Sequence, residues 1–112
     1  MPLDRDPAAV LDIVTAARLI LEFKRGMDFA TFASDAKTLS AIIHQLLIIG
    51  EATKRLSAEF KAAHPAIPWQ DVARMRDKMI HHYEEVNRRE VWRAAETDIP
   101  ALLDALAPLR PS

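Results

Sequence analysis

Eight consecutive residues, from Arg76 to Tyr83, bring together side chains that can act on a phosphate ester. The stretch holds an arginine, a carboxylate, a lysine, two histidines and a tyrosine. The planar fork of an arginine bonds two phosphate oxygens at once, and an imidazole can take up and return a proton near neutral pH. These residue types suit phosphoryl transfer, in which Arg76 would stabilise the charge that develops around phosphorus and a histidine would serve as acid or base.

The spacing within this stretch separates its two most reactive members. The step from Arg76 to His81 corresponds to about 500° of rotation on a continuous helix, which leaves the two side chains roughly 140° apart. Asp77 and His81, by contrast, form an i, i+4 pair in which the carboxylate favours the protonated imidazole. One chain therefore does not assemble a compact pair of Arg76 and His81 by spacing alone.

Other interpretations of the same stretch stay open. It can be a solvated helix end, with Arg76 paired to an acid and Tyr83 packed against neighbouring helices. His82 and Glu85 could form a metal-binding face, although no further clustered ligands accompany them. The basic residues between positions 74 and 93 could form a rim for RNA, but acidic residues alternate with them, as on an ordinary solvated surface.

The rest of the chain has the composition of a small helical scaffold. Its 112 residues are 50% hydrophobic and 28% charged, with only 2 glycines, and this balance favours helices over strands. We therefore predict one all-α domain spanning residues 1–112. The formal net charge of -1 gives no overall attraction to nucleic acid or to a membrane surface.

Composition also excludes several kinds of site. The chain has no cysteine, which rules out disulfides, thiolate catalysis and zinc–thiolate sites. Its acidic N-terminus lacks a signal-peptide core, and the longest apolar run, Ala41 to Ile49, is too short to span a membrane. We expect a soluble, cytoplasmic protein without a cofactor or a bound metal.

Apolar residues at helical spacing outline the first half of the chain. Asp6 and Pro7 predict the start of a first helix, with Asp6 as its cap, and Gly26 predicts its end. A second helical stretch is expected to run from about Phe29 to Leu56. The predicted buried face of the first helix consists of Val10, Ile13, Val14, Ala17, Ile20 and Leu21.

The middle of the second stretch is apolar on more than one face between Leu39 and Ile49, which indicates the centre of a bundle or a subunit interface. Gly50 costs about 1 kcal/mol relative to alanine in mid-helix, so we expect a neighbour to approach it closely. Glu51 either approaches the Arg76 site or is an ordinary exposed carboxylate. His44 is expected to be a hydrogen-bonded residue of the core or of an interface.

Capping and breaking signals outline the second half. Ser57 is expected to cap a short helix, and Pro68 to open the helix that carries Arg76. Asn87 predicts the start of a final helix, which Pro100 should kink or break. Short connections favour antiparallel neighbours, hence an up-and-down bundle of four or five helices. The predicted inner face of the final helix consists of Val91, Ala95, Ile99, Leu102, Leu106 and Leu109.

The order Arg76-x4-His81-x-Tyr83 resembles the Arg-x4-His-x-Tyr signature of HepT-like toxins, which are members of the HEPN group of ribonucleases. The resemblance covers most of the chain. It extends over residues 48–52, 54–56, 67–69, 75–76, 91–92 and 98–100.

This resemblance implies a homodimer in which facing Arg76 and His81 residues form a composite cleft that cleaves RNA, such as tRNA or mRNA, without a metal. The ribose 2′-hydroxyl would attack, with His81 as acid or base and Arg76 as the phosphate stabiliser. The resemblance also implies a HEPN/MNT toxin–antitoxin system, in which a minimal nucleotidyltransferase antitoxin silences the toxin by transferring AMP to Tyr83.

Two positions depart from the pattern of the family that the chain resembles. Asp77 stands where the family often has Asn and adds a negative charge beside the phosphate, and His82 stands where Gly is frequent and offers a second imidazole. Asp77 and His82 are therefore candidate auxiliary residues, and Glu51 is a third. A different class of function is also compatible with the sequence, namely a non-catalytic HEPN module that binds a nucleotidyltransferase and presents Tyr83 to it.

Overall fold

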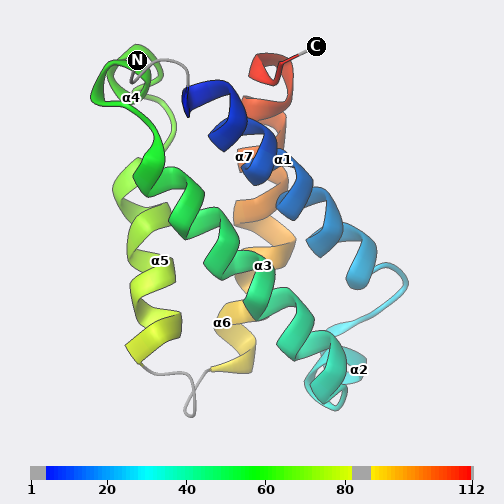
Figure 1. Cartoon of the computed structure of the whole chain (residues 1–112). Coiled ribbons are helices and arrows are strands. Elements are labelled where there is room, and N and C mark those ends of the chain that lie inside the picture. The colour runs from blue at the N-terminus through cyan, green and yellow to red at the C-terminus, as the bar shows by residue number, and fades with distance from the viewer. Residues whose placement is uncertain (1–4, 82–86, 112) are drawn as a thin grey trace.

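The computed structural model describes residues 5–81 and 87–111, except for the side chains of residues 77–81. The regular structure in these two ranges is helical throughout and contains no strand, which confirms the predicted all-α class. The long helical segments alternate in direction along the chain (Figure 1). In the same two ranges, no helix is both long and apolar enough to span a membrane.

Helix α1 (Arg5–Phe23) buries the predicted face except for Leu21, which is partly buried, but it does not begin as predicted. Asp6 lies inside the helix and is buried, and its carboxylate accepts hydrogen bonds from the backbone N–H (2.8 Å) and the hydroxyl (2.6 Å) of Ser57. The prediction that Asp6 caps α1 is therefore wrong, because this carboxylate joins the start of α1 to the start of another helix. Gly26 follows α1 with a φ of 76°, a left-handed conformation that suits the predicted stop.

The stretch predicted as one helix from Phe29 is divided in two. Helix α2 (Phe29–Ala33) is capped by Asp28, which accepts a hydrogen bond from the N–H of Thr31 at 2.8 Å. Helix α3 (Ala36–Arg55) is capped by Asp35 in the same way through Thr38, at 3.1 Å. The repeated Asp-x-x-Thr pattern is thus the signal for two helix starts, because each aspartate captures backbone donors of the turn that follows it.

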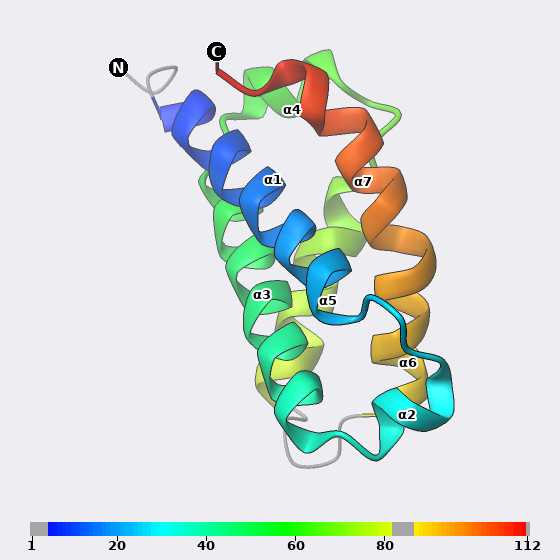
Figure 2. The ribbon, with the colours of Figure 1, turned by 90° about the vertical axis from the view of Figure 1, so that its right-hand side faces the viewer.

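Helix α3 lies at the centre of the helix packing, as predicted. It packs against α1 on one side and against α5 (Trp69–His81) on the other (Figures 1 and 2). His44 is exposed, so the core half of its prediction is wrong, and the alternative place in a subunit interface stays a prediction. The buried residues of α3 are Ile42, Ile43, Leu46, Ile49, Gly50, Ala52 and Thr53.

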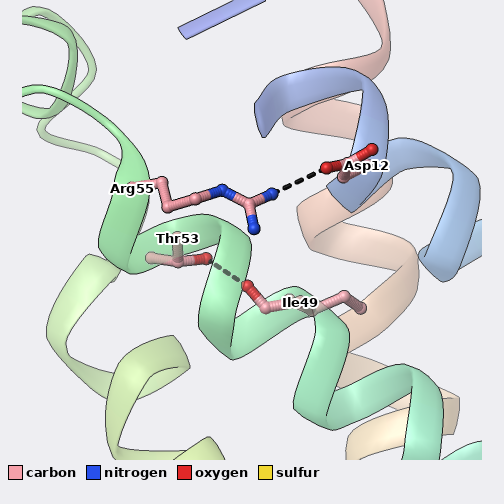
Figure 3. Close-up of polar contacts among 4 residues, drawn as sticks. All are labelled: Asp12, Ile49, Thr53 and Arg55. Atoms are coloured by element: carbon pink, nitrogen blue, oxygen red, sulfur yellow. Dashed lines mark hydrogen bonds and ion pairs between the residues drawn. The ribbon is translucent and has the colours of Figure 1, made fainter. Parts of the chain in front are cut away.

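Two polar contacts near the C-terminal end of α3 are drawn in Figure 3, one within α3 and one that joins α3 to α1. The buried hydroxyl of Thr53 donates a hydrogen bond to the carbonyl of Ile49 at 2.8 Å, which offsets the cost of removing the hydroxyl from water. Arg55 reaches across to Asp12 of α1, with 2.6 Å between the guanidinium nitrogen and the carboxylate oxygen.

The connection from α3 to α5 follows the predicted signals. Helix α4 (Ala58–Ala63) is capped by Ser57, whose hydroxyl accepts a hydrogen bond from the N–H of Phe60 at 3.0 Å. After α4, the ring N–H of Trp69 donates to the carbonyls of Lys61 (3.2 Å) and His64 (3.0 Å). These bonds anchor the first turn of α5 against the end of α4.

The last segment is continuous through Pro100. It consists of α6 (Arg88–Arg93), the π-helical turn η3 (Ala94–Asp98), α7 (Ile99–Leu106) and the 3-10 turn η4 (Ala107–Leu109). The predicted cap is confirmed, because the Asn87 side chain accepts hydrogen bonds from two backbone N–H groups of α6. The helix does not break at Pro100. The wider turn of η3 comes just before it, because a proline has no N–H to donate to the preceding turn.

The predicted inner face of this segment is buried except at its end. Leu109 is 36% exposed, so its predicted place in the core is wrong. The change from α-helix to the tighter turn η4 alters the direction of the side chains beyond Leu106.

Candidate functional site

Arg76 lies in the second half of α5, a helix that runs without interruption from Trp69 to His81. Because the helix is continuous, the positions of Arg76 and His81 differ by about 140° around its axis. The first turn of α5 is held by the Trp69 hydrogen bonds and by the burial of Val72. Helix α5 packs against α3, and this contact positions Arg76.

Gly50 of α3 makes room for Arg76. A Cβ atom built on Gly50 would lie 2.0 Å from the Cβ and 2.5 Å from the Cγ of Arg76, which is far too close for carbon atoms that are not bonded to each other. The predicted close approach at Gly50 is therefore confirmed, and its partner is the base of the Arg76 side chain. The backbones of α3 and α5 can come this close only because the residue on α3 has no side chain.

Glu51, the next residue of α3, contacts the other end of the same side chain. Its Oε1 atom forms an ion pair with an Nη atom of Arg76. The Arg76 side chain is 25% exposed and that of Glu51 is 50% exposed, so the pair lies at the surface with the arginine largely covered. Two adjacent residues of α3 thus contact both ends of Arg76.

The remaining candidate residues fall beyond what the structure describes. His81 is the last residue of α5, and the side chains of Asp77 and His81 are outside the described part, as are His82 and Tyr83 entirely. The metal face proposed for His82 and Glu85 lies there as well. Within residues 5–76 and 87–111, no group of three or more histidine and carboxylate side chains could hold a metal ion.

The basic residues near Arg76 are interleaved with acids in space as well as in sequence. Arg74 lies 3.5 Å from Asp71, and Arg93 lies 3.5 Å from Asp98. Both arginines are more than half exposed. This part of the surface is therefore of mixed charge and not a uniformly basic rim.

The sequence interpretation did not anticipate a groove of about 450 Å³ between α5 and the segment from η3 to α7. One wall includes Val72 and Met75, the other includes Ile99 and Leu102, and the ion-paired arginines 74 and 93 lie among its lining residues. Alanines of the last segment leave this space open. Arg76 is not among the residues that line it, so the groove and the Arg76 contact are separate features.

Comparison with known proteins relates the chain to one family. A family model described as "Ribonuclease HepT-like" matches residues 13–109. "Probable ribonuclease HepT" of Thermococcus cleftensis is 48% identical over 99 residues, which cover 88% of this chain and 90% of that relative.

More distant relatives carry similar names. "Putative RNase MJ0127" of Methanocaldococcus jannaschii is 38% identical over 100 residues, or 89% of this chain and 83% of the relative. "Putative RNase TTE0752" of Caldanaerobacter subterraneus subsp. tengcongensis is 39% identical over 90 residues, or 80% of each protein. No solved structure matches the chain significantly.

Proposed function

The chain belongs to the HepT-like ribonuclease family, and on that premise we propose that it is a metal-independent endoribonuclease and the toxin of a HEPN/MNT toxin–antitoxin pair. The observation that carries the proposal is the arrangement of Arg76. This signature arginine is held at the α3–α5 contact with a quarter of its side chain exposed, where a phosphate group can reach it.

The proposed reaction is an attack of the ribose 2′-hydroxyl on the adjacent phosphorus. The bond from O2′ to phosphorus forms while the bond from phosphorus to O5′ breaks, which yields a 2′,3′-cyclic phosphate and a 5′-hydroxyl. His81 takes the proton of the 2′-hydroxyl or delivers one to the leaving O5′, and water exchanges the other proton. Arg76 stabilises the negative charge that grows on the phosphorane oxygens.

A homodimer would resolve the angular separation of Arg76 and His81, because residues of two chains can face one cleft. The outward side of α3 supports such an arrangement. It carries the exposed His44 and the half-buried apolar residues Leu47 and Ile48, next to the pair of Glu51 and Arg76. In this proposal a cognate nucleotidyltransferase inactivates the toxin by transferring AMP to Tyr83, which lies near His81 in sequence.

The test is cleavage of total RNA by the purified protein in the presence of EDTA. We expect cleavage by the wild type and a loss of about 100-fold or more in Arg76→Ala and His81→Ala, the usual effect of removing one group that stabilises the transition state. Arg74→Ala is the matched control, since Arg74 is an exposed arginine of the same helix. Cleavage that survives both active-site substitutions would contradict the proposal.

The alternative is a non-catalytic HEPN module that presents Tyr83 to a nucleotidyltransferase. One observation favours it, because the carboxylate of Glu51 offsets the charge of Arg76. This alternative predicts that a wild-type preparation whose Tyr83 is modified by the partner enzyme does not cleave RNA before that modification.

A further inference from the structure

We propose that Glu51 is a positioning residue for the ribonuclease reaction, because its carboxylate holds the Arg76 guanidinium in the orientation in which it meets the scissile phosphate. The inference rests on the proposed function. It assigns a role to the α3 helix, which lies outside the signature that runs from Arg76 to Tyr83.

The first step of the argument is steric. The missing side chain of Gly50 lets the Cβ and Cγ atoms of Arg76 lie directly against α3. This contact limits the rotations available at the base of the side chain but leaves the distal torsions of the arginine undetermined. A long side chain fixed only at its base still loses conformational freedom when it binds a ligand.

The second step concerns the distal end. The ion pair with Glu51 restrains the guanidinium itself, and Glu51 follows Gly50 directly in sequence. One turn of α3 therefore restrains Arg76 at both ends before RNA arrives. A side chain that is already ordered needs less reorganisation when negative charge develops on the phosphate in the transition state, which is the general basis of preorganised charge stabilisation.

The third step is that a carboxylate and a phosphate can use one guanidinium together. A guanidinium carries five N–H donors, so it can bond a carboxylate through one nitrogen and a phosphate through others. Arginine stays protonated in proteins, so Glu51 is not needed to keep Arg76 charged. The contribution of Glu51 is thus geometric, and it should affect turnover more than substrate binding.

The experiment compares kcat and KM of Glu51→Ala and Glu51→Gln with the wild type on one defined RNA, with Glu59→Ala as the control. Glu59 is an exposed glutamate of α4. We expect kcat of Glu51→Ala to fall about 10-fold without an increase in KM. We expect Glu51→Gln, which retains an acceptor oxygen, to stay within about 3-fold of the wild type.

The opposite sign would overturn the inference. If Glu51 competes with the phosphate for Arg76, Glu51→Ala will raise kcat/KM, and if the pair is irrelevant, kcat will not change. A purely structural role would lower the melting temperature and the active fraction while leaving kcat per folded molecule unchanged, and this result would also overturn the inference.

A readout that does not need cleavage separates this inference from the proposed function. The mobility of the Arg76 Nε–H group can be measured by NMR relaxation, with the more exposed Arg74 as the internal reference. We expect Arg76 to be more ordered than Arg74 in the wild type and to become measurably more mobile in Glu51→Ala. Equal mobility in the wild type would refute the positioning role, whereas an ordered Arg76 in a protein that does not cleave RNA would refute only the ribonuclease assignment.

Discussion

Helix α3 forms an arginine–carboxylate pair with each of its two main neighbours, and the two pairs differ in how the arginine is held. Arg55 of α3 meets Asp12 of α1 with side chains that are 52% and 51% exposed (Figure 3). Glu51 of α3 meets Arg76 of α5, whose side chain is only 25% exposed. An arginine–carboxylate pair therefore occurs once with a half-exposed arginine and once with an arginine that is largely covered by a neighbouring helix.

The difference shows what each helix contact contributes. The α1–α3 contact buries large apolar side chains such as Ile13, and its exposed ion pair adds little to stability. At the α3–α5 contact, by contrast, position 50 is a glycine without a side chain, and the base of the charged residue Arg76 lies against the helix there. This difference supports the proposal that the first contact mainly stabilises the fold and that the second mainly positions Arg76.

The largest effect is expected from Gly50→Ala. Alanine would normally stabilise a helix interior by about 1 kcal/mol relative to glycine. Here the added Cβ would lie 2.0 Å from the Cβ of Arg76, so α3 and α5 must separate. We expect a net loss of about 1–3 kcal/mol in the free energy of unfolding, measured by urea denaturation, and a loss of RNA cleavage of about 10-fold or more.

The control for this prediction is a milder destabilising substitution in the core on the side of α1. Ile13→Val removes one buried methylene group from α1 and should cost about 0.5–1.5 kcal/mol. Its cleavage rate per folded molecule should stay near that of the wild type. If both variants lose activity in proportion to stability, the division of roles between the two contacts is wrong.

A smaller effect is expected at the exposed pair. A double-mutant cycle with Asp12→Ala and Arg55→Ala should give a coupling energy of about 0–1 kcal/mol, because both groups are half exposed and screened by salt. Neither substitution should reduce RNA cleavage. A coupling energy well above this range in thermal or urea unfolding would mean that the α1–α3 contact depends on its ion pair after all.

The smallest effect concerns the starts of α2 and α3, away from both contacts. Hydrogen bonds from the backbone N–H and then the hydroxyl of Thr31 lower the pKa of Asp28 below its ordinary value of 3.8, and Thr38 does the same for Asp35. A lowered pKa in the folded state means that these carboxylates stabilise the protein above about pH 4 and lose this contribution as the pH falls through their folded pKa values.

We therefore expect the melting temperature of the wild type to fall more steeply below about pH 4 than that of a variant with both Asp28→Asn and Asp35→Asn. Asparagine can still cap a helix but does not titrate in this range. Equal slopes for the two proteins would show that these caps do not contribute to acid sensitivity.

Local signals in the sequence predicted much of the fold. Ser57 and Asn87 cap the helices expected of them, since a cap bonds to donors two or three residues away. The division between α2 and α3 is also encoded locally, in the repeated Asp-x-x-Thr pattern, but the apolar periodicity continues across it and favours a single helix. The π-helical turn before Pro100 was anticipated only as a kink or a break, because a proline has several structural solutions.

What the sequence by itself determined is the all-α class, the positions of most helix starts, and an arginine, a histidine and a tyrosine at the spacing of a ribonuclease family. The tertiary structure decided which distant residues meet. Asp6 bonds to Ser57, and Glu51 together with Gly50 meets Arg76. Contacts of this kind depend on the crossing of packed helices, and helix periodicity indicates which face is buried but not which residue of another helix will lie opposite.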